Sequence, residues 1–292
     1  MLGSLPAELA VAILIEAAER FIVADRATTV SLALTGRYVY NIVRPILLRV
    51  CIIDSNYYLI DDTLTNGGAG ALVKDINVLT GNWVPTQEAV SCLSNLQCLR
   101  GTSHIVEAII EMLPQSARKS LWSLELWSKQ TIRRIPAGIT HLCLYGYVLQ
   151  TSSLDALVVW LCRAPSITHI GIDVIIEEDT TFDALQENLP LGFQRVLEVG
   201  GSRLQTIAAR IQGGSVSNGD WERLLETMLS WSRNNEMAAM QADRRVALWR
   251  EGRIFDDWRD ETRAALDDCL AGIDLWTEAC SLAEWTETVR VL

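Results

Sequence analysis

The sequence predicts an α/β fold in which a short solenoid of irregular repeats follows a helical segment and precedes an α-helical tail. Three observations support this prediction. Short apolar runs of one form recur through the middle of the chain, the segments between them have helical or turn character, and apolar residues recur at helical spacing near both ends. We therefore divide the 292 residues into a helical segment at 1–45, repeats at 46–202, a linker at 203–219 and a tail at 220–292.

A helix is predicted to begin near residue 5. Pro6 suits a first helical turn, and Leu9 and Ile13 then lie at helical spacing. A second helix is predicted over 27–40. Pro45 is expected to end this unit, because proline disfavours the helical conformation in the residue before it.

The central region carries runs of the form apolar-x-x-apolar-x-apolar. In each run the alternate apolar side chains point to one side of a short strand, and the returning segment covers them, so that stacked units share one core. An ordinary α/β sheet with coincidental spacing is the alternative. The runs begin at Leu47, Val73, Leu93, Leu121, Ile139 and Ile167, with a weaker seventh at Gln194.

Residues between the apolar positions of these runs are expected to line the other face of the strands. Two runs have nearly the same sequence, Ile-Thr-His-Leu at 139–142 and Ile-Thr-His-Ile at 167–170, which places two histidines in one column. Asn95 and Gln97 fall in the same columns in this register. A slip of one residue would turn all of these side chains inward. The candidate protein-binding residues on this face are Glu125, Trp127, His141, Tyr145, His169 and Asp173.

The tail differs from the repeats in charge and in aromatic content. Residues 201–219 are rich in glycine and serine and are predicted to form a linker. From Asp220 onward there are 16 acidic and 9 basic residues, and six of the ten tryptophans. Trp221, Met228 and Trp231 share one helical stripe, and a second stripe runs from Trp258 to Trp276. We interpret these stripes as a packed helical core; a peptide-binding surface is the alternative.

Composition excludes several classes of protein. A net charge of −11 argues against nonspecific binding of DNA or RNA, which needs a basic face. No apolar stretch is long enough to cross a bilayer, and no signal peptide is expected. The seven cysteines are scattered and odd in number, so free thiols are expected in place of a zinc site.

The sequence also gives no indication of catalysis. It lacks a Gly-x-Ser-x-Gly elbow, a phosphate-binding loop and a His-Glu-x-x-His motif. The acidic group Asp256, Asp257, Asp260 and Glu261 lacks the spacing of a calcium loop and is interpreted as a solvated helix face. We expect no enzyme activity, no cofactor and no metal, and a cytoplasmic or nuclear protein.

A stretch of about 45 residues in the first part of the chain resembles an F-box. The resemblance rests on Leu-Pro-Ala-Glu-Leu at 5–9, on Ser-Leu-Ala-Leu-Thr-Gly-Arg at 31–37 and on Val-Arg-Pro-Ile-Leu-Leu-Arg-Val at 43–50. Together with irregular leucine-rich-repeat-like runs and a tryptophan-rich tail, this plan is similar to the expanded F-box families of mushroom-forming (basidiomycete) fungi. Tyr38 and Tyr40 stand where the family usually has a tryptophan, and the repeats lack the regular asparagine of well-ordered leucine-rich repeats.

The resemblance implies a non-catalytic substrate receptor of a cullin-based, SCF-type ubiquitin ligase. Its F-box would dock on the Skp-type adaptor, which joins the cullin scaffold, and its repeats would hold an unknown client protein. Packing of the same F-box-like residues onto the first repeat is the alternative for this segment. A protein-interaction scaffold with a vestigial F-box is the alternative for the whole chain. The candidate adaptor-binding residues are Leu5, Pro6, Leu9, Ile13 and Leu14.

Overall fold

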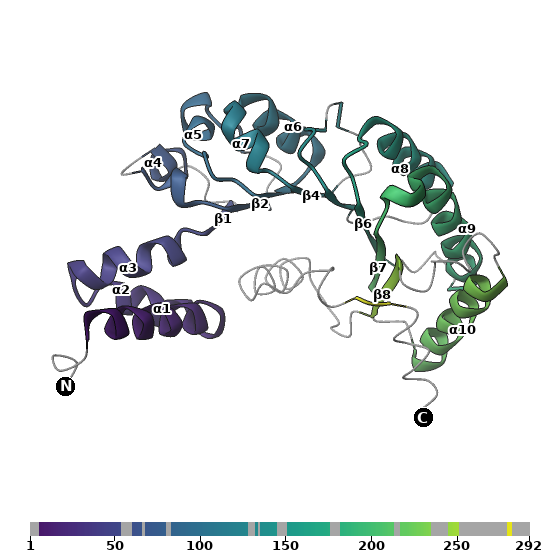
Figure 1. Cartoon of the computed structure of the whole chain (residues 1–292), viewed down its shortest axis with the longest axis horizontal. Coiled ribbons are helices and arrows are strands. Elements are labelled where there is room, and N and C mark those ends of the chain that lie inside the picture. Colours follow the sequence, from purple (N-terminus) through teal and green to yellow (C-terminus); the bar gives the residue numbers. More distant parts are fainter. Residues whose placement is uncertain are drawn as a thin grey trace.

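A single sheet with helices along one side organises the chain in the computed structural model (Figure 1). In the part of the chain that the structure describes, nine strands follow one another across the sheet in the order of the sequence, from β1 to β9. Strands β1 to β8 are parallel, and β9 pairs with β8 in the antiparallel direction. The α/β class predicted from the sequence is therefore confirmed. The structure describes residues 6–53, 60–65, 68–79, 83–127, 132–133, 135–144, 151–175, 182–212, 217–234, 245–250 and 279–281.

Three helices precede the sheet and pack on one another. Asp25 separates the first two, and its carboxylate accepts hydrogen bonds from the backbone N–H groups of Ala27 and Thr28, which caps the second helix. Gly36 lies between the second and third helices, so the predicted helix over 27–40 is two helices. Pro45 lies inside the third helix and does not end it. These helices, called the helical head below, are α1 (Ala7–Ala24), α2 (Arg26–Ala33) and α3 (Arg37–Leu47).

The remaining helices lie along the outer side of an arc, and the strands lie along its inner side (Figure 1). With the exception of β4, each parallel strand up to β7 is followed in the described residues by at least one helix, which lies between it and the next strand. The strands are β1 (Val50–Ile53), β2 (Asp75–Val78), β3 (Cys98–Gly101), β4 (Ser123–Leu126), β5 (His141–Leu144), β6 (His169–Ile175), β7 (Thr206–Gln212), β8 (Val246–Arg250) and β9 (Cys280–Ser281). The helices are α4 (Ile60–Thr65), η4 (Gly70–Leu72), α5 (Gln87–Ser91), α6 (Ser103–Met112), α7 (Gln115–Ser120), α8 (Thr151–Arg163), α9 (Phe182–Gly200), η5 (Gly201–Arg203) and α10 (Asn218–Asn234).

A run of main-chain hydrogen bonds joins successive strands at their first residues. The carbonyl oxygen of the residue before each strand from β1 to β6 accepts two N–H groups from the next unit. The N–H groups of Lys74 and Asp75, for example, both donate to the carbonyl of Arg49, at 2.9 and 3.1 Å. We call this feature the strand-start ladder. Its acceptor carbonyls belong to Arg49, Lys74, Gln97, Trp122, Thr140 and Thr168.

The main core lies between the sheet and the outer helices. Buried columns cross the sheet from strand to strand, because residues in register point to the same side. One such column joins Ile76, Leu99, Leu124, Leu142, Ile170 and Ile207, all of them fully buried. The helical head has a separate core, made by Ala18, Ile22, Ala33, Val43, Ile46 and Val50.

The observed register corrects three of the predicted runs. The first run begins at Leu48 and not at Leu47, because Cys51 pairs with Ile76; Val50 packs on the helical head instead. The third run begins at Leu96 and not at Leu93, since Leu99 is the partner of Ile76 and Leu124. The predicted seventh run, from Gln194, lies inside α9.

The predicted linker is wrong for residues 206–212, which form β7. This strand carries the true seventh run, with Leu204, Ile207 and Ala209 buried. Within the predicted tail, α10 is helical as expected, but 246–250 and 280–281 are strands. Trp221 and Met228 of α10 are buried in the main core, so the packed-core interpretation of this first stripe is confirmed. The second stripe, 258–276, and the acidic group at 256–261 lie outside the described residues.

Candidate functional site

The strand face opposite the outer helices carries two columns of mostly polar side chains, and we call it the inner face. Register places Glu125 beside Cys143 and His141 beside His169, as predicted from the sequence. Asn95 and Gln97 do not belong to these columns, because Cys98 and Arg100 occupy their places on β3. The columns are Asp75, Cys98, Ser123, His141, His169 and Thr206, and Asn77, Arg100, Glu125, Cys143, Gly171 and Ala208.

Glu125 is held between a cation and an indole. A nitrogen of Arg100 lies 3.5 Å from one carboxylate oxygen of Glu125, across the β3–β4 pair. The indole Nε1 of Trp127 donates a hydrogen bond of 3.3 Å to the other oxygen. These contacts fix the orientation of the half-buried Trp127 ring on the inner face.

His141 and His169 stack ring on ring. Their centroids are 4.0 Å apart with 8° between the planes, and Trp122 contacts His141 edge-on at 4.7 Å. The preceding threonines position both rings, since Thr140 Oγ1 and Thr168 Oγ1 lie 2.9 and 2.8 Å from the respective Nδ1 atoms. Burial and the neighbouring His169 ring lower the pKa of His141 to about 4, and burial also lowers the pKa of His169. Both rings are therefore neutral at pH 7.

Asp173 was predicted to contact a protein partner, but it forms an ion pair with Arg210. Its side chain is fully buried, and Arg210 Nε donates a hydrogen bond of 2.9 Å to Oδ2. The Arg210 guanidinium carbon in turn lies 5.2 Å from the centroid of the Trp249 ring, within cation–π distance. Asp173 thus positions Arg210 and Trp249 and does not offer its own carboxylate to a partner.

Cys143 lies between these two ion pairs on the inner face. Burial, together with the carboxylates of Glu125 and Asp173, raises the pKa of the Cys143 thiol well above its usual value. Burial likewise raises the pKa of Cys98. Both thiols stay protonated at neutral pH and are poor nucleophiles. The arrangement is suited to holding a partner through aromatic and polar contacts.

The described residues provide neither a metal cluster nor a disulfide in this region. No group of three or more histidine, cysteine, aspartate or glutamate side chains converges among them. The cysteines whose side chains are described are free thiols, namely Cys51, Cys92, Cys98, Cys143 and Cys162. Within the same part of the chain, no helix is long and apolar enough to span a membrane.

The helical head exposes apolar side chains. Leu9 and Ile13, two of the predicted adaptor-binding residues, are 48% and 45% exposed, so they do not pack on the first repeat. Pro6 is exposed as well, Leu14 is half-buried, and Leu5 lies outside the described residues. Of the twelve large apolar side chains that are exposed in the described part of the chain, eight lie in the helical head or directly after α2: Leu9, Ile13, Ile15, Phe21, Val30, Leu34, Tyr38 and Tyr40.

Sequence reasoning missed the partners that orient the inner-face residues. The predicted register of β3 was wrong, so Arg100 was not assigned to the inner face. Arg210 was assigned to the predicted linker. A search for a seventh run after Gly201 would have found Leu204, Ile207 and Ala209 and, one residue on, Arg210. Tyr145, the remaining predicted contact, lies outside the described residues.

Comparison with protein-family models and with curated protein sequences finds no match for the chain.

Proposed function

We propose that the chain is a non-catalytic substrate receptor of an SCF-type ubiquitin ligase, in which the helical head docks on a Skp-type adaptor and the inner face binds a client protein. The observation that carries the proposal is the concentration of exposed apolar side chains on the helical head. Apolar groups gathered on one small helical unit are typical of a surface that a partner covers.

The arrangement of the strands supports the repeat part of the proposal. Each unit contributes one short parallel strand and a returning segment, and the strand-start ladder recurs from unit to unit. These features support an irregular leucine-rich-repeat solenoid as part of the proposal, because neighbouring units of such a solenoid share a continuous core. The inner side of such an arc is a large surface for a protein partner.

The contacts on the inner face support a protein client. Trp127 is held by Glu125, and Trp122, His141 and His169 form one aromatic group. Aromatic rings held in place by their neighbours bind protein surfaces at low entropic cost. The proposed client contacts are Glu125, Trp127, His141 and His169, with Tyr145 as a further prediction.

Adaptor docking is tested with the full chain and a purified Skp-type adaptor in a pull-down assay. We expect stoichiometric binding that Leu9→Asp abolishes, because a carboxylate would have to be desolvated in an apolar interface. Leu191→Asp is the matched control: Leu191 is 58% exposed on α9, far from the helical head in Figure 1, and this variant is expected to bind normally. Thermal unfolding of both variants monitors folding.

The scaffold with a vestigial F-box gives the opposite result in this assay. In that case the wild-type chain would not retain the adaptor, and Leu9→Asp would change nothing. Equal loss of binding by Leu9→Asp and Leu191→Asp would also contradict docking through α1.

Client binding is tested by quantitative mass spectrometry of the proteins that the chain retains. We expect Trp127→Ala to lose client proteins that the wild type and the control Val159→Ala keep; Val159 is exposed on α8. An unchanged set of proteins with a correctly folded Trp127→Ala variant would contradict the inner-face assignment.

A further inference from the structure

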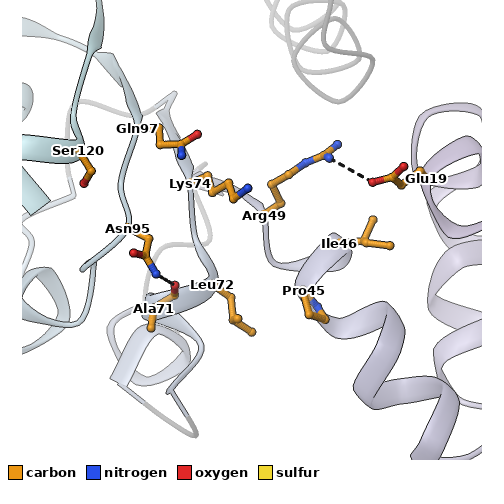
Figure 2. A pocket seen from close by; sticks show the side chains of 10 residues that line it. All are labelled: Glu19, Pro45, Ile46, Arg49, Ala71, Leu72, Lys74, Asn95, Gln97 and Ser120. Carbon is orange, nitrogen blue, oxygen red and sulfur yellow. Dashed lines mark hydrogen bonds and ion pairs between the residues drawn. The ribbon is translucent and has the colours of Figure 1, made fainter. Parts of the chain in front are cut away.

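A pocket of about 400 Å³ lies where the helical head meets the first units of the sheet (Figure 2). Its volume is in the range of pockets that hold small molecules. Elements far apart in the sequence contribute to it, from α1 and α3 of the helical head to the segments that precede β2, β3 and β4. The lining residues are Glu19, Pro45, Ile46, Arg49, Ala71, Leu72, Lys74, Asn95, Gln97 and Ser120.

One side of the pocket is formed by hydrogen-bond donors. Figure 2 shows the side chains of Arg49, Lys74 and Gln97 in a row. They are neighbours because they are consecutive members of the strand-start ladder, so about 4.8 Å separates each from the next along the sheet. The charged groups of arginine and lysine donate hydrogen bonds but accept none, so this side requires a ligand that carries acceptor atoms.

The two cations are weakly engaged by the protein itself. The ion pair of Arg49 with Glu19 is long, at 3.9 Å, and both side chains are partly exposed to solvent. Such a pair contributes little to stability and is readily exchanged for another partner. Lys74 forms no ion pair with any residue in the described ranges.

Other groups close to the pocket define what the ligand must be. Asp75 interacts electrostatically with Arg49 and Lys74, although its side chain belongs to the inner face, and Glu19 adds a second carboxylate. The two carboxylates thus balance the charges of Arg49 and Lys74. Selectivity for a ligand therefore comes from the hydrogen-bond donors that converge on the pocket. Leu72 and Pro45 lie opposite the donors in Figure 2 and offer an apolar surface.

We infer that this pocket binds a small anion with an apolar body, a phosphate monoester or a carboxylate, whose charged group lies on Arg49, Lys74 and Gln97 and whose apolar part lies on Leu72 and Pro45. The ligand contacts the helical head and the sheet together and therefore stabilises their junction. This inference does not depend on adaptor docking or on client binding.

The test is a ligand-observed NMR titration of the full chain in a buffer free of phosphate. The probes are phenyl phosphate, benzoate and the uncharged benzyl alcohol, so the two anions distinguish a phosphate ligand from a carboxylate ligand. For probes of this size we expect a Kd on the order of 1 mM for the preferred anion. Benzyl alcohol is expected to bind at least about tenfold more weakly, because it lacks a charged acceptor.

The variants assign the binding to this pocket. Lys74→Gln removes one donor charge and is expected to weaken anion binding about tenfold, since a charge-assisted hydrogen bond is lost. Arg163→Gln removes the same charge from α8, away from the pocket, and is expected to bind like the wild type. Lys74 is an exposed side chain, so its substitution leaves the fold intact.

Three results would overturn the inference. They are no binding of either anion up to concentrations about tenfold above the expected Kd, equal binding of benzyl alcohol, and equal weakening by Lys74→Gln and Arg163→Gln.

Discussion

The stacked histidines couple the stability of the inner face to pH. The folded protein holds the pKa of His141 at about 4 and that of His169 below its usual value. An unfolded chain binds protons at these rings near pH 6.5. Between pH 6.5 and 4 the unfolded state therefore carries more protons than the folded state, and the free energy of unfolding falls as the pH is lowered.

We predict that His141→Gln reduces this acid sensitivity. Between pH 7 and pH 4 the wild type loses about 1 to 2 kcal/mol more of its free energy of unfolding than the variant, once partial exposure of the ring is allowed for. Urea denaturation at a series of pH values measures the difference. Parallel pH profiles for His141→Gln and wild type would contradict the prediction.

The ion pair between Asp173 and Arg210 also affects the free energy of unfolding. Removing Asp173 leaves the largely buried guanidinium of Arg210 without its counter-ion. We predict that Asp173→Ala lowers the free energy of unfolding by about 3 kcal/mol or more. Asp183→Ala breaks an ion pair with Arg223 that is 4.0 Å long and exposed, and is expected to cost less than about 1 kcal/mol.

Chemical denaturation of both aspartate variants checks this contrast. Equal and small effects would mean that water reaches Arg210 and replaces the carboxylate. A double variant, Asp173→Leu with Arg210→Met, is expected to recover much of the loss, because it removes both charges from the buried site.

The sequence was a good guide to these residues only where the repeats are nearly identical. The two Ile-Thr-His segments predicted correctly that His141 and His169 lie in one column. Around β3, leucines recur every three residues at 93, 96 and 99, so the run can begin at Leu93, with Cys98 at its third position, or at Leu96, with Gly101 there. Pairing with β2 and β4 selects the register that begins at Leu96, and apolar spacing does not contain that information.

At the scale of elements, the close approach of η4 to α5 limits what the chain tolerates. A Cβ atom on Gly70 would lie 2.7 Å from Cys92 Cβ and 2.9 Å from the carbonyl oxygen of Leu64. Neither neighbour is the flexible end of a side chain, so the backbone would have to move. Glycine is required here by the contact between two elements, because φ at this residue is not positive.

We predict that Gly70→Ala lowers the free energy of unfolding by about 1 to 3 kcal/mol. Gly219→Ala is the matched control, because a Cβ atom there would meet only Ser217 Oγ, at 3.8 Å, in the first turn of α10. The control is expected to be neutral or slightly stabilising, since alanine favours helix over glycine by up to about 1 kcal/mol. Urea midpoints compare the two variants, and equal midpoints would contradict the crowding of η4 against α5.

Elements were predicted well where apolar residues are large and poorly where they are small. Strand β7 was missed because alanines occupy positions 208 and 209 and glycines flank the segment, which together are typical of a linker. Pro190 lies inside α9, which continues to Gly200, although proline disfavours the interior of a helix. Long-range strand pairing overrides these local preferences.

At the scale of the whole molecule, the two cores predict two levels of stability. The core of the helical head is small, and Val50 and the partly buried Ile52 connect it to β1. The main core extends without interruption from Ile53 to Leu248. A small core buries less apolar surface and therefore opens at a lower free energy.

We predict that amide hydrogens of α1, α2 and α3 exchange with solvent faster than those of β3 to β6. Hydrogen–deuterium exchange with mass spectrometry measures this difference. Val50→Ala is expected to increase exchange in the helical head while β4 and β5 keep their protection. Uniform protection across both parts, or uniform loss in the variant, would contradict the separation of the two cores.

The strand-start ladder has a consequence for how this chain can diverge in evolution. It is made of main-chain atoms, so the backbone of each unit must return to the start of the next strand. The ladder does not depend on which side chains are present there. Along the ladder, from β1 to β7, the interval between strand starts ranges from 18 residues, between β4 and β5, to 37, between β6 and β7, while the spacing of the strands stays that of a sheet. Returning segments are therefore free to lengthen or shorten, and inner-face residues are free to change one at a time. Lineages that share this backbone can lose detectable sequence similarity and still present new binding surfaces at fixed positions.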